Sequence, residues 1–396
     1  MSPHRYSLVL ANRWAILAVL IVVRVAMGFQ FQSVAAIAPI IATDLKLDYT
    51  QVGKLVGFYM LPGIVIAIPG GFLGSRFTDL TMVLFGIGLM ALGGVVAGLA
   101  GDFNVLAIGR LLSGAGAVVQ SIFLVKMIAE WFDAKSVVTA MAIMLSGWPV
   151  GIAIALTALG PLAATWGWQA VMHSTAIGCV VAMAVLWLSY QRPPGSAVSS
   201  GGGSRFRIPR RELVMVCFAG LVWTIYNLAY FSFLSFGPAM LIERGLDVAA
   251  AGRAISLASW AALPALPLGG YLADRTGRPG LVLAISCLLA AGATAALPLS
   301  GQPHLLCAAI GLFAAAPAGI IMGRAISVMS PSYRAQGNAI LYTFFYGGMG
   351  VIPGLIGWSA DSAGTAAAPL YFSATILVLS VPLFLALNAT PGRRTR

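Results

Sequence analysis

Charged residues are scarce in this chain. Only 9% of its 396 residues are Asp, Glu, Lys or Arg, whereas 60% are hydrophobic. So few polar side chains cannot cover the surface of a soluble globule of this length. The composition therefore excludes a soluble protein and indicates an integral membrane protein.

Motifs for several common chemistries are also missing. The sequence has no GxxxxGK[ST] motif for the phosphates of ATP and no HExxH or clustered Cys/His set for a metal ion. The histidines are scattered and the cysteines lie singly in apolar runs: His4, His173, His304, Cys179, Cys217, Cys287 and Cys307. No nucleophile with a base, and no pair of acids, lies within an apolar run. We therefore expect no enzyme, no cofactor and no metal site.

Carboxylates are absent from the middle of every apolar run. All eleven Asp and Glu residues fall in expected loops or at the ends of expected spans. Carriers of cations usually need a carboxylate inside the membrane to bind the cation. This absence argues against a cationic solute and leaves any basic residue in a span without an acid at its depth.

Twelve apolar stretches are long enough to cross a bilayer, which takes about 20 residues. We expect them near 14–40, 52–73, 81–100, 104–130, 136–159, 168–190, 213–240, 251–273, 280–299, 303–328, 338–358 and 368–389. One long polar stretch, with Pro-Pro, a Ser/Gly-rich middle and a basic tail, separates the sixth span from the seventh. The sequence thus predicts an N-terminal six-helix bundle (1–191), a linker (192–212) and a C-terminal six-helix bundle (213–396).

The positions of Lys and Arg predict the orientation of the chain. If the termini and the linker are cytoplasmic, only Lys46, Lys54, Arg244 and Arg253 lie at or near the outside. The net charge of +12 is then explained by topology, and no nucleic-acid partner is expected. We expect a monomeric, multi-pass protein of a bacterial-type inner (plasma) membrane, surrounded by the lipid bilayer, with both termini cytoplasmic.

The two halves of the chain are similar in sequence. A shift of 199 positions places Asp48 on Asp247 and Gly53 on Gly252, within an ungapped register of roughly thirty residues. This indicates an internal duplication, which is typical of secondary carriers whose binding site lies where the repeats meet.

The loop after the second span of each half carries a motif. The second copy reads GYLADRTGR, and the first reads GFLGSRFTD. The motif resembles the cytoplasmic loop motif of the major facilitator superfamily, and the twelve spans and duplicated halves extend the resemblance over the whole chain. It implies a loop that latches neighbouring helices, with its acid capping a helix end and pairing with arginines. The expected latch residues are Gly71, Arg76, Asp79, Gly270, Asp274, Arg275, Gly277 and Arg278, where Asp79 would replace the acid that is missing at Ser75.

Arg24 is the deepest charge in the first span. It lies ten residues past Trp14, hence about 15 Å along a helix, which is too deep to reach the interface easily. Its equivalent in the second half is Trp223, so the duplicated fold does not require it. We expect Arg24 to bind the substrate; the alternative is an arginine that donates to backbone carbonyls.

Arg110 lies on the fourth span in the stretch RLLSGAG, which is similar to the arginine-glycine pattern of the same superfamily. The resemblance implies that Arg110 organises the substrate cavity and takes part in proton coupling, although a structural role fits the sequence equally well. On the seventh span, a further set of aromatic and polar residues recurs on one helical face and predicts a wall of the site. These residues are Trp223, Tyr226, Asn227 and Tyr230.

Other positions complete the predicted cavity. They are Gln30, Tyr59, Lys126, Trp148, Trp260, Arg324 and Tyr346. Lys126 and Arg324 have the alternative of reaching the cytoplasmic interface, and each aromatic residue has that of a lipid-facing or core position.

Together these features predict a secondary transporter, a symporter or antiporter, that moves a small anion by alternating access. The anion would be exchanged for a counter-anion or carried with a proton. Glycine-rich fifth and eleventh spans resemble those of nitrate/nitrite porters, so the nearest branches are anion porters of the nitrate/nitrite or cyanate type. Two alternatives remain open: proton-coupled efflux of neutral or lipophilic compounds, and a transport-inactive membrane sensor.

Overall fold

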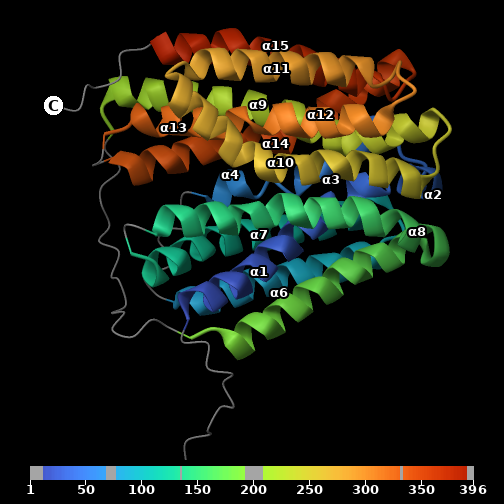
Figure 1. Cartoon of the computed structure of the whole chain (residues 1–396). Helices are drawn as coiled ribbons and strands as arrows, with labels where there is room; N and C mark the ends of the chain where they lie inside the picture. Colours follow the sequence, from blue (N-terminus) through green and yellow to red (C-terminus); the bar gives the residue numbers. More distant parts are fainter. Residues whose placement is uncertain (1–11, 68–76, 134–135, 192–207, 331–332, 390–396) are drawn as a thin grey trace, which may run out of the picture.

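The described part of the chain folds into α-helices. The computed structural model describes residues 12–67, 77–133, 136–191, 208–330 and 333–389. The helices are α1 (Arg13–Ala36), α2 (Ala38–Leu45), α3 (Tyr49–Phe58), α4 (Gly63–Ile66), α6 (Asp79–Gly98), α7 (Phe103–Trp131), α8 (Val137–Ser189), α9 (Arg210–Glu243), α10 (Val248–Thr276), α11 (Pro279–Ala296), α12 (Pro303–Ala315), α13 (Pro317–Ser327), α14 (Arg334–Ala363) and α15 (Ala368–Ala389). Most of them run side by side along one direction, and the predicted all-α membrane fold is confirmed (Figure 1).

Ten helical stretches of the described residues are long and apolar enough to cross a membrane. The helix α8 contains both the fifth and the sixth predicted spans. Gly167, with a φ of 80° and a ψ of 164°, forms a kink that divides it into two helical segments. The predicted second span comprises α3, a turn and α4, and its end lies outside the described residues. With α8 counted as two spans, the ten stretches account for eleven of the predicted spans, and α3 with α4 accounts for the remaining one, the second.

Proline divides two of the predicted spans into shorter helices. The first span, expected as one helix over 14–40, ends at Ala36, and α2 follows with Pro39 in its first turn. The tenth span is split into α12 and α13, and α13 begins at Pro317. Proline lacks the N–H that continues a helix hydrogen-bond ladder but fits the first turn, so at these two positions a new helix begins. Other spans run through an internal proline, as α9 does at Pro238 and α14 at Pro353.

Side-chain caps fix where several helices begin, and two of them repeat between the halves. Asp48 accepts a hydrogen bond of 2.7 Å from the backbone N–H of Gln51 at the start of α3. Asp247, 199 positions later, accepts one of 2.8 Å from Ala250 at the start of α10. A carboxylate at this position satisfies an N–H group that the helix leaves unpaired. The caps therefore fall where the sequence duplication places them.

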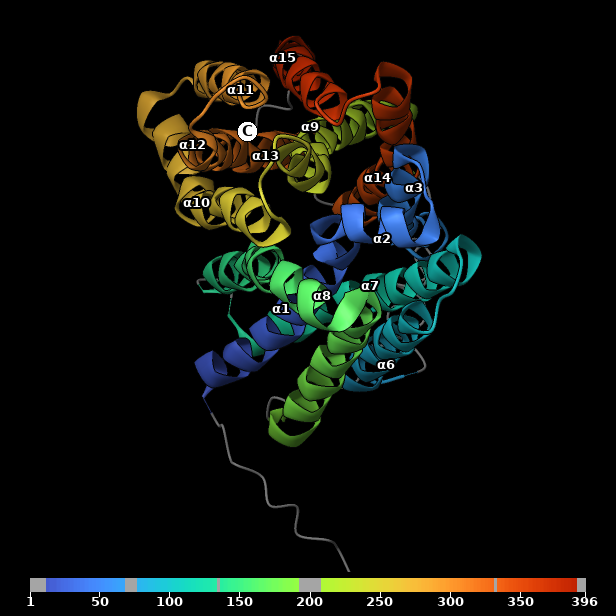
Figure 2. The ribbon, with the colours of Figure 1, turned by 90° about the vertical axis from the view of Figure 1, so that its right-hand side faces the viewer.

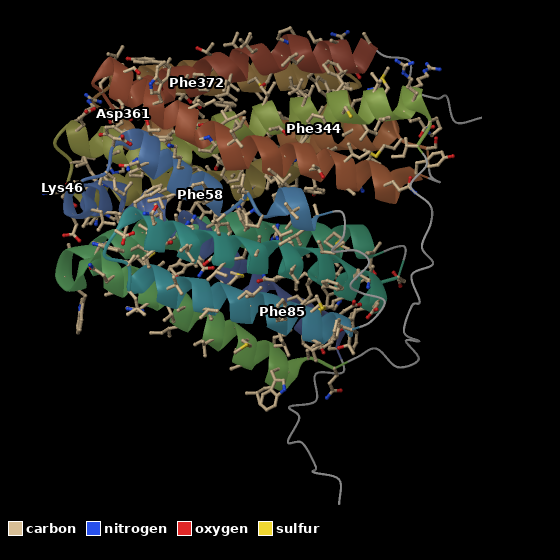
Figure 3. The ribbon with its side chains drawn as sticks, turned by 180° about the vertical axis from the view of Figure 1, so that it is seen from behind. Lys46, Phe58, Phe85, Phe344, Asp361 and Phe372 are labelled. Carbon is tan, nitrogen blue, oxygen red and sulfur yellow. The ribbon has the colours of Figure 1, made fainter. Side chains whose placement is uncertain are left out.

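The helices gather into two groups that follow the order of the chain. Viewed along the helices, α1, α6, α7 and α8 lie on one side and α9 to α15 on the other, with α3 beside α14 (Figure 2). We call residues 12–191 the first half and residues 208–389 the second half. The end of the molecule where α8 finishes and α9 begins is the linker end, and the opposite end, where Lys46 and Asp361 lie, is the Asp361 end (Figure 3).

The two halves are in close contact at the Asp361 end. The carboxylate of Asp361, near the end of α14, accepts hydrogen bonds from the backbone N–H groups of Tyr49 (2.9 Å) and Thr50 (2.8 Å) at the start of α3. Deeper in the same region, Gln32 of α1 donates from its side-chain amide to the carbonyl of Leu234 in α9 at 2.8 Å. This end of the interface is therefore sealed by polar contacts between the halves.

Glycine brings the backbones together in the same region, in two equivalent places. A Cβ atom at Gly53 of α3 would lie 2.1 Å from the carbonyl oxygen of Pro353, and one at Gly252 of α10 would lie 2.1 Å from that of Leu156. Gly53 and Gly252 are the pair aligned by the duplication. The contact of α3 with α14 and that of α10 with α8 thus form a pseudo-symmetric pair of seals.

Large apolar side chains cover the outside of the molecule. Phe85, Phe344 and Phe372 are 55%, 39% and 39% exposed and lie on the face seen in Figure 3. An exposed apolar belt of this kind is expected of a protein whose solvent is the lipid bilayer.

Candidate substrate site

Arg24 lies eleven residues into α1, about 16 Å from the linker end of that helix. Its Nη1 donates to the hydroxyl of Ser121 on α7 at 2.8 Å and to the sulfur of Met27 at 3.2 Å. Its Nε is buried and has no hydrogen-bond partner among the described residues. The alternative that Arg24 is saturated by backbone carbonyls is therefore not what the contacts show, and part of its donor capacity is unused.

Aromatic and small residues of α8 make room for this guanidinium group. The Arg24 Cζ atom lies 5.1 Å from the centre of the Trp148 ring, within the range of a cation–π contact. The neighbouring Gly147 lets α8 approach, because a Cβ there would lie 3.1 Å from the Cβ of Arg24.

The second half also contributes to the surroundings of Arg24. Tyr342 and Tyr346 of α14 lie close enough to interact with it electrostatically, as does Tyr59 of the first half. At 100° per residue, Tyr342 and Tyr346 point away from Phe344, which lies on the outer face of α14. Arg24 therefore lies where the two halves meet, as expected for the binding site of a duplicated carrier.

No carboxylate lies near Arg24 in the described structure. The two ion pairs found among the described residues are Arg13–Asp133 and Lys126–Asp79, and neither includes it. The acids lie in loops or near helix ends, as predicted: Asp44, Asp48, Asp79, Asp102, Glu130, Asp133, Glu212, Glu243, Asp247, Asp274 and Asp361. A buried cation without a counter-charge is costly, so Arg24 is suited to an anionic ligand.

Arg110 occupies a different environment. It is only 2% exposed, and its guanidinium group donates to the backbone carbonyls of Leu55 (3.1 Å), Gln30 (2.9 Å) and Phe31 (3.0 Å). Its Cζ also lies 4.6 Å from the centre of the Tyr59 ring. In this conformation Arg110 joins α1, α3 and α7, which matches the structural alternative considered for it, and its predicted contact with substrate stays a prediction.

The predicted stripe on the seventh span, now α9, is divided between two surroundings. The hydroxyl groups of Tyr226 and Tyr230 donate to the carbonyls of Ala314 and Ala258 inside the second half. Trp223 instead packs against Phe345 of α14, and its buried indole N–H has no partner among the described residues. Asn227 donates back to the carbonyl of Trp223 at 2.7 Å.

Three further predicted cavity residues also have structural contacts or outward positions. Gln30 is 2% exposed and donates to the carbonyl of Met90 at 2.8 Å. Tyr59 is fully buried, with its hydroxyl 3.3 Å from the carbonyl of Met27. Trp260 is 43% exposed on α10. From the same list, Trp148 lies against Arg24, and Tyr346 is close enough to interact with it electrostatically.

Lys126 and Arg324 form contacts near the linker end. Lys126 lies 2.8 Å from the carboxylate of Asp79, the first residue of α6. Arg324 donates to the carbonyls of Leu387 (3.3 Å) and Asn388 (3.2 Å) in the last turn of α15, where a positive charge is favourable. Both residues thus take up positions away from Arg24, in line with the alternative that they reach the interface.

The Lys126–Asp79 pair is expected to contribute little to stability. The side chains are 39% and 13% exposed, so water screens part of their attraction. A double-mutant cycle of Lys126→Met and Asp79→Asn should give a coupling free energy below about 1 kcal/mol in thermal or denaturant unfolding. Asp79→Asn alone should cost more than the coupling, because Asp79 also faces the N-terminus of α6. A coupling of several kcal/mol would contradict this view of the pair.

The predicted latch is described in part. Gly71 and Arg76 lie outside the described residues. In the second copy, Gly270, Asp274 and Arg275 belong to the last turns of α10, which ends at Gly277 with a φ of 63°, and Arg278 precedes α11. Arg275 donates to the hydroxyl of Tyr271 at 3.1 Å. The acid–arginine pairing expected of the latch is not among the contacts of Asp274 in the described residues, so it stays a prediction for another conformation.

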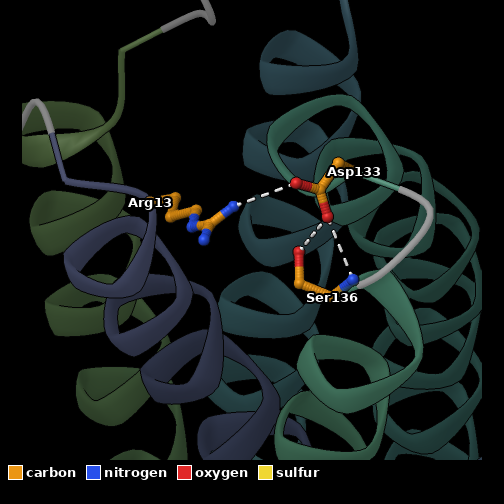
Figure 4. Close-up of polar contacts among 3 residues, drawn as sticks. All are labelled: Arg13, Asp133 and Ser136. Carbon is orange, nitrogen blue, oxygen red and sulfur yellow. Dashed lines mark hydrogen bonds and ion pairs between the residues drawn. The ribbon is translucent and has the colours of Figure 1, made fainter.

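A small polar cluster ties α1 to the α7–α8 turn at the linker end. Arg13 lies 3.5 Å from one carboxylate oxygen of Asp133, and the other oxygen accepts bonds from the backbone N–H (3.0 Å) and hydroxyl (2.6 Å) of Ser136 (Figure 4). All three residues belong to the first half. The cluster therefore joins elements within that half.

Two features of the interface were not found from the sequence. Asp361 was recognised only as an acid near a span end, although it joins the halves. Phe345 connects Trp223 to Tyr346, with ring centres 6.5 and 5.5 Å apart. In the sequence, only the spacing of Phe345 four residues before Met349 could have indicated that Phe345 lies on the inner face of α14.

Comparison with known proteins identifies the family. The model of the Major Facilitator Superfamily matches residues 20–310 and 222–396. The chain is 26% identical over 358 residues to the hexuronate transporter of Bacillus subtilis (strain 168), covering 83% of each chain. It is 28% identical over 323 residues to the 3-(3-hydroxy-phenyl)propionate transporter of Escherichia coli (strain K12), covering 78% of each. These relatives do not support the narrower placement beside nitrate/nitrite or cyanate porters.

The fold is similar to that of solved transporters. The inward-open conformation of the xylose transporter XylE from E. coli matches with a TM-score of 0.78, over 97% of this chain and 98% of that one, at 13% identity. The helical fold, the family model and the relatives agree that the protein is a multi-pass membrane transporter and not an enzyme. The chain belongs to the major facilitator superfamily of secondary transporters.

Proposed function

We propose that this transporter moves small organic anions that carry a carboxylate, and that Arg24 is their charge partner. The observation that carries the proposal is the partly buried guanidinium group of Arg24, whose Nε is buried without a partner and which has no carboxylate near it in the described residues. A planar guanidinium matches a carboxylate with two parallel hydrogen bonds. A bound anion would supply both the missing charge and the missing acceptors.

The relatives favour an organic acid over an inorganic anion. A hexuronate and a hydroxyphenylpropionate both carry a carboxylate, and these solutes are named for the two relatives described above. Arg24 offers the group needed to bind that carboxylate. The other residues of the site would determine which non-carboxylate part of the solute is accepted.

Transport would proceed by alternating access of Arg24 to the two sides of the membrane. The bias of Lys and Arg favours a cytoplasmic linker end, so the sealed Asp361 end would face outward and the present conformation would face inward. The bundles 1–191 and 213–396 would then rock about Arg24, with 192–212 as the linker. We expect a counter-anion or a proton to supply the coupling, and a monomer to suffice.

A ligand screen with a matched pair of arginine variants tests this proposal. Purified protein, Arg24→Gln and Arg253→Gln are unfolded thermally with carboxylates, inorganic anions, cations and neutral drugs. A ligand at a hundredfold excess over its dissociation constant stabilises the folded state by about 2.7 kcal/mol. We expect carboxylates to stabilise the parent and the Arg253→Gln control, since Arg253 is exposed on α10.

For Arg24→Gln, the dissociation constant of the carboxylate should rise about 30-fold or more, because removal of one partner of a buried charge pair costs at least about 2 kcal/mol. Stabilisation by neutral compounds alone, unchanged in Arg24→Gln, would replace this proposal by the efflux alternative. Stabilisation by inorganic anions alone would keep the anion but reject the carboxylate.

A further inference from the structure

We infer that the preferred solutes are carboxylates with a flat aromatic body, held by Arg24 at the carboxylate and by the aromatic rings of α8, α9 and α14 at the body. The inference rests on the proposed function and makes it narrower. It separates the two kinds of acid that the relatives carry, a polyhydroxylated sugar acid and an aromatic acid.

The rings near Arg24 come from both halves. On α14, the ring centres of Phe345 and Tyr346 are 5.5 Å apart, and those of Tyr342 are 6.2 Å from each of them. Trp148 of the first half lies against Arg24, with its ring centre 5.1 Å from Cζ. Ring distances of this size suit edge-to-face and offset contacts with an additional aromatic ring.

Access to these rings distinguishes them from a closed core. Tyr342 is 39% exposed, and Arg24, Trp148, Phe345 and Tyr346 are each partly exposed. On α14 they share the face opposite to Val351 and Leu355, which are 57% and 60% exposed toward the outside. The exposure of the rings therefore belongs to the side where the halves meet.

Beyond the hydroxyl groups of Tyr342 and Tyr346, the hydrogen-bonding groups around Arg24 are few, and the two that are buried without a partner are donors. Ser121 is already bonded to Arg24, and Met27 offers only a thioether. Unused donors are the Nε of Arg24 and the indole N–H of Trp223. A sugar acid brings more hydroxyl groups than two tyrosines can pair, so most of them would lose a water partner here. An aromatic acid needs partners only for its carboxylate and any ring substituent.

Trp223 extends the set as a second, weaker anchor. Its ring centre lies 6.5 Å from that of Phe345, so it continues the aromatic surface away from Arg24. Its N–H is buried without an acceptor in the described residues, and buried donors are normally paired. An oxygen substituent on the ring of the solute would supply that acceptor.

Four acids of matched charge test the inference: 3-phenylpropionate, 3-cyclohexylpropionate, glucuronate and butyrate. Their dissociation constants are measured with the full chain by thermal stabilisation and confirmed by uptake into proteoliposomes. We expect 3-phenylpropionate to bind at least about 10-fold more tightly than glucuronate. It should also bind about 3- to 10-fold more tightly than 3-cyclohexylpropionate, which buries a similar area without an aromatic ring.

Two variants on opposite halves, Trp148→Leu and Tyr346→Leu, should each lower the preference for the phenyl over the cyclohexyl acid to below about 3-fold. The control is Trp358→Leu, a tryptophan on α14 that is 61% exposed, which should keep the preference. Unfolding without ligand shows whether each variant is folded, and either variant alone suffices for the test.

The outcomes separate this inference from the proposed function. Tighter binding of glucuronate than of 3-phenylpropionate, with dependence on Arg24, would overturn the aromatic inference and leave the organic-anion proposal intact. Equal binding of the phenyl and cyclohexyl acids in parent and variants would also overturn it, because the body would then be held by apolar burial only. Absence of stabilisation by all four acids, together with a response to neutral compounds, would overturn both.

Discussion

Arg110→Lys is expected to destabilise the protein by at least about 3 kcal/mol, and more than Arg110→Met does. The guanidinium group of Arg110 reaches three carbonyls on two neighbouring helices, at 2.9 to 3.1 Å. A lysine keeps the charge in the same buried place but lacks the planar fork that satisfies it. An uncompensated buried charge costs about 3–5 kcal/mol, whereas an apolar side chain of similar length removes the charge along with its contacts.

The measurement is thermal and denaturant unfolding of the parent, Arg110→Lys, Arg110→Met and the control Arg253→Lys in the same detergent. Arg253 is exposed, so its replacement should stay within about 0.5 kcal/mol of the parent. The result that would contradict the structural role is an Arg110→Lys protein of normal stability that no longer transports. Arg110 would then act on the solute or on a proton in a conformation other than this one.

The contrast between Arg24 and Arg110 shows how far sequence patterns identify a site. Both are arginines within apolar spans, and hydropathy treats them alike. What separates them is whether backbone carbonyls of other helices lie within reach, and this depends on helix packing. The duplication predicted a site between the halves, because a register of 199 positions implies two equivalent bundles, and the binding of solute there stays a prediction.

The fold was predictable to a greater extent than the site. Span length follows from bilayer thickness and helix rise, and the capping residues Asp48 and Asp247 mark helix starts directly. The breaks at Pro39 and Pro317 were missed because hydropathy does not register backbone hydrogen bonds. On α9, the helical period placed Trp223 and Tyr226 on one face, yet that face is wide enough to contact both the second half's interior and α14.

Alanine at Gly53 and Gly57 together is expected to open the Asp361 end. Cβ atoms at these positions would lie 2.1 Å and 2.3 Å from the carbonyl oxygens of Pro353 and Gly350. The backbone of α14 cannot give way as a flexible side chain can, so α3 and α14 must separate. Overpacking of this kind costs about 1–3 kcal/mol per site. Because it destabilises only the conformation with a closed Asp361 end, the ratio of closed to open molecules should fall by about tenfold or more.

A cysteine placed at Gln32 reports this opening. Gln32 is fully buried and contacts Leu234 of the other half. In Gln32→Cys, reaction with a membrane-impermeant maleimide should be at least about tenfold faster when Gly53→Ala and Gly57→Ala are added. The native cysteines Cys179, Cys287 and Cys307 are buried, whereas Cys217 is partly exposed, so all variants carry Cys217→Ala and the background is measured without Gln32→Cys.

The matched control is Gly88→Ala with Gly292→Ala, since a Cβ at either position meets no atom within 4 Å. Within a helix, alanine is more stable than glycine by about 0.5–1 kcal/mol, so both pairs of substitutions stabilise their helices. Only the pair at Gly53 and Gly57 disturbs the contact of α3 with α14. Equal labelling of the two pairs would mean that the close approach of α3 and α14 does not hold this end shut. Faster labelling of the first pair with loss of transport would instead place the barrier to alternating access at this contact, because a carrier that cannot close one end cannot release its solute at the other.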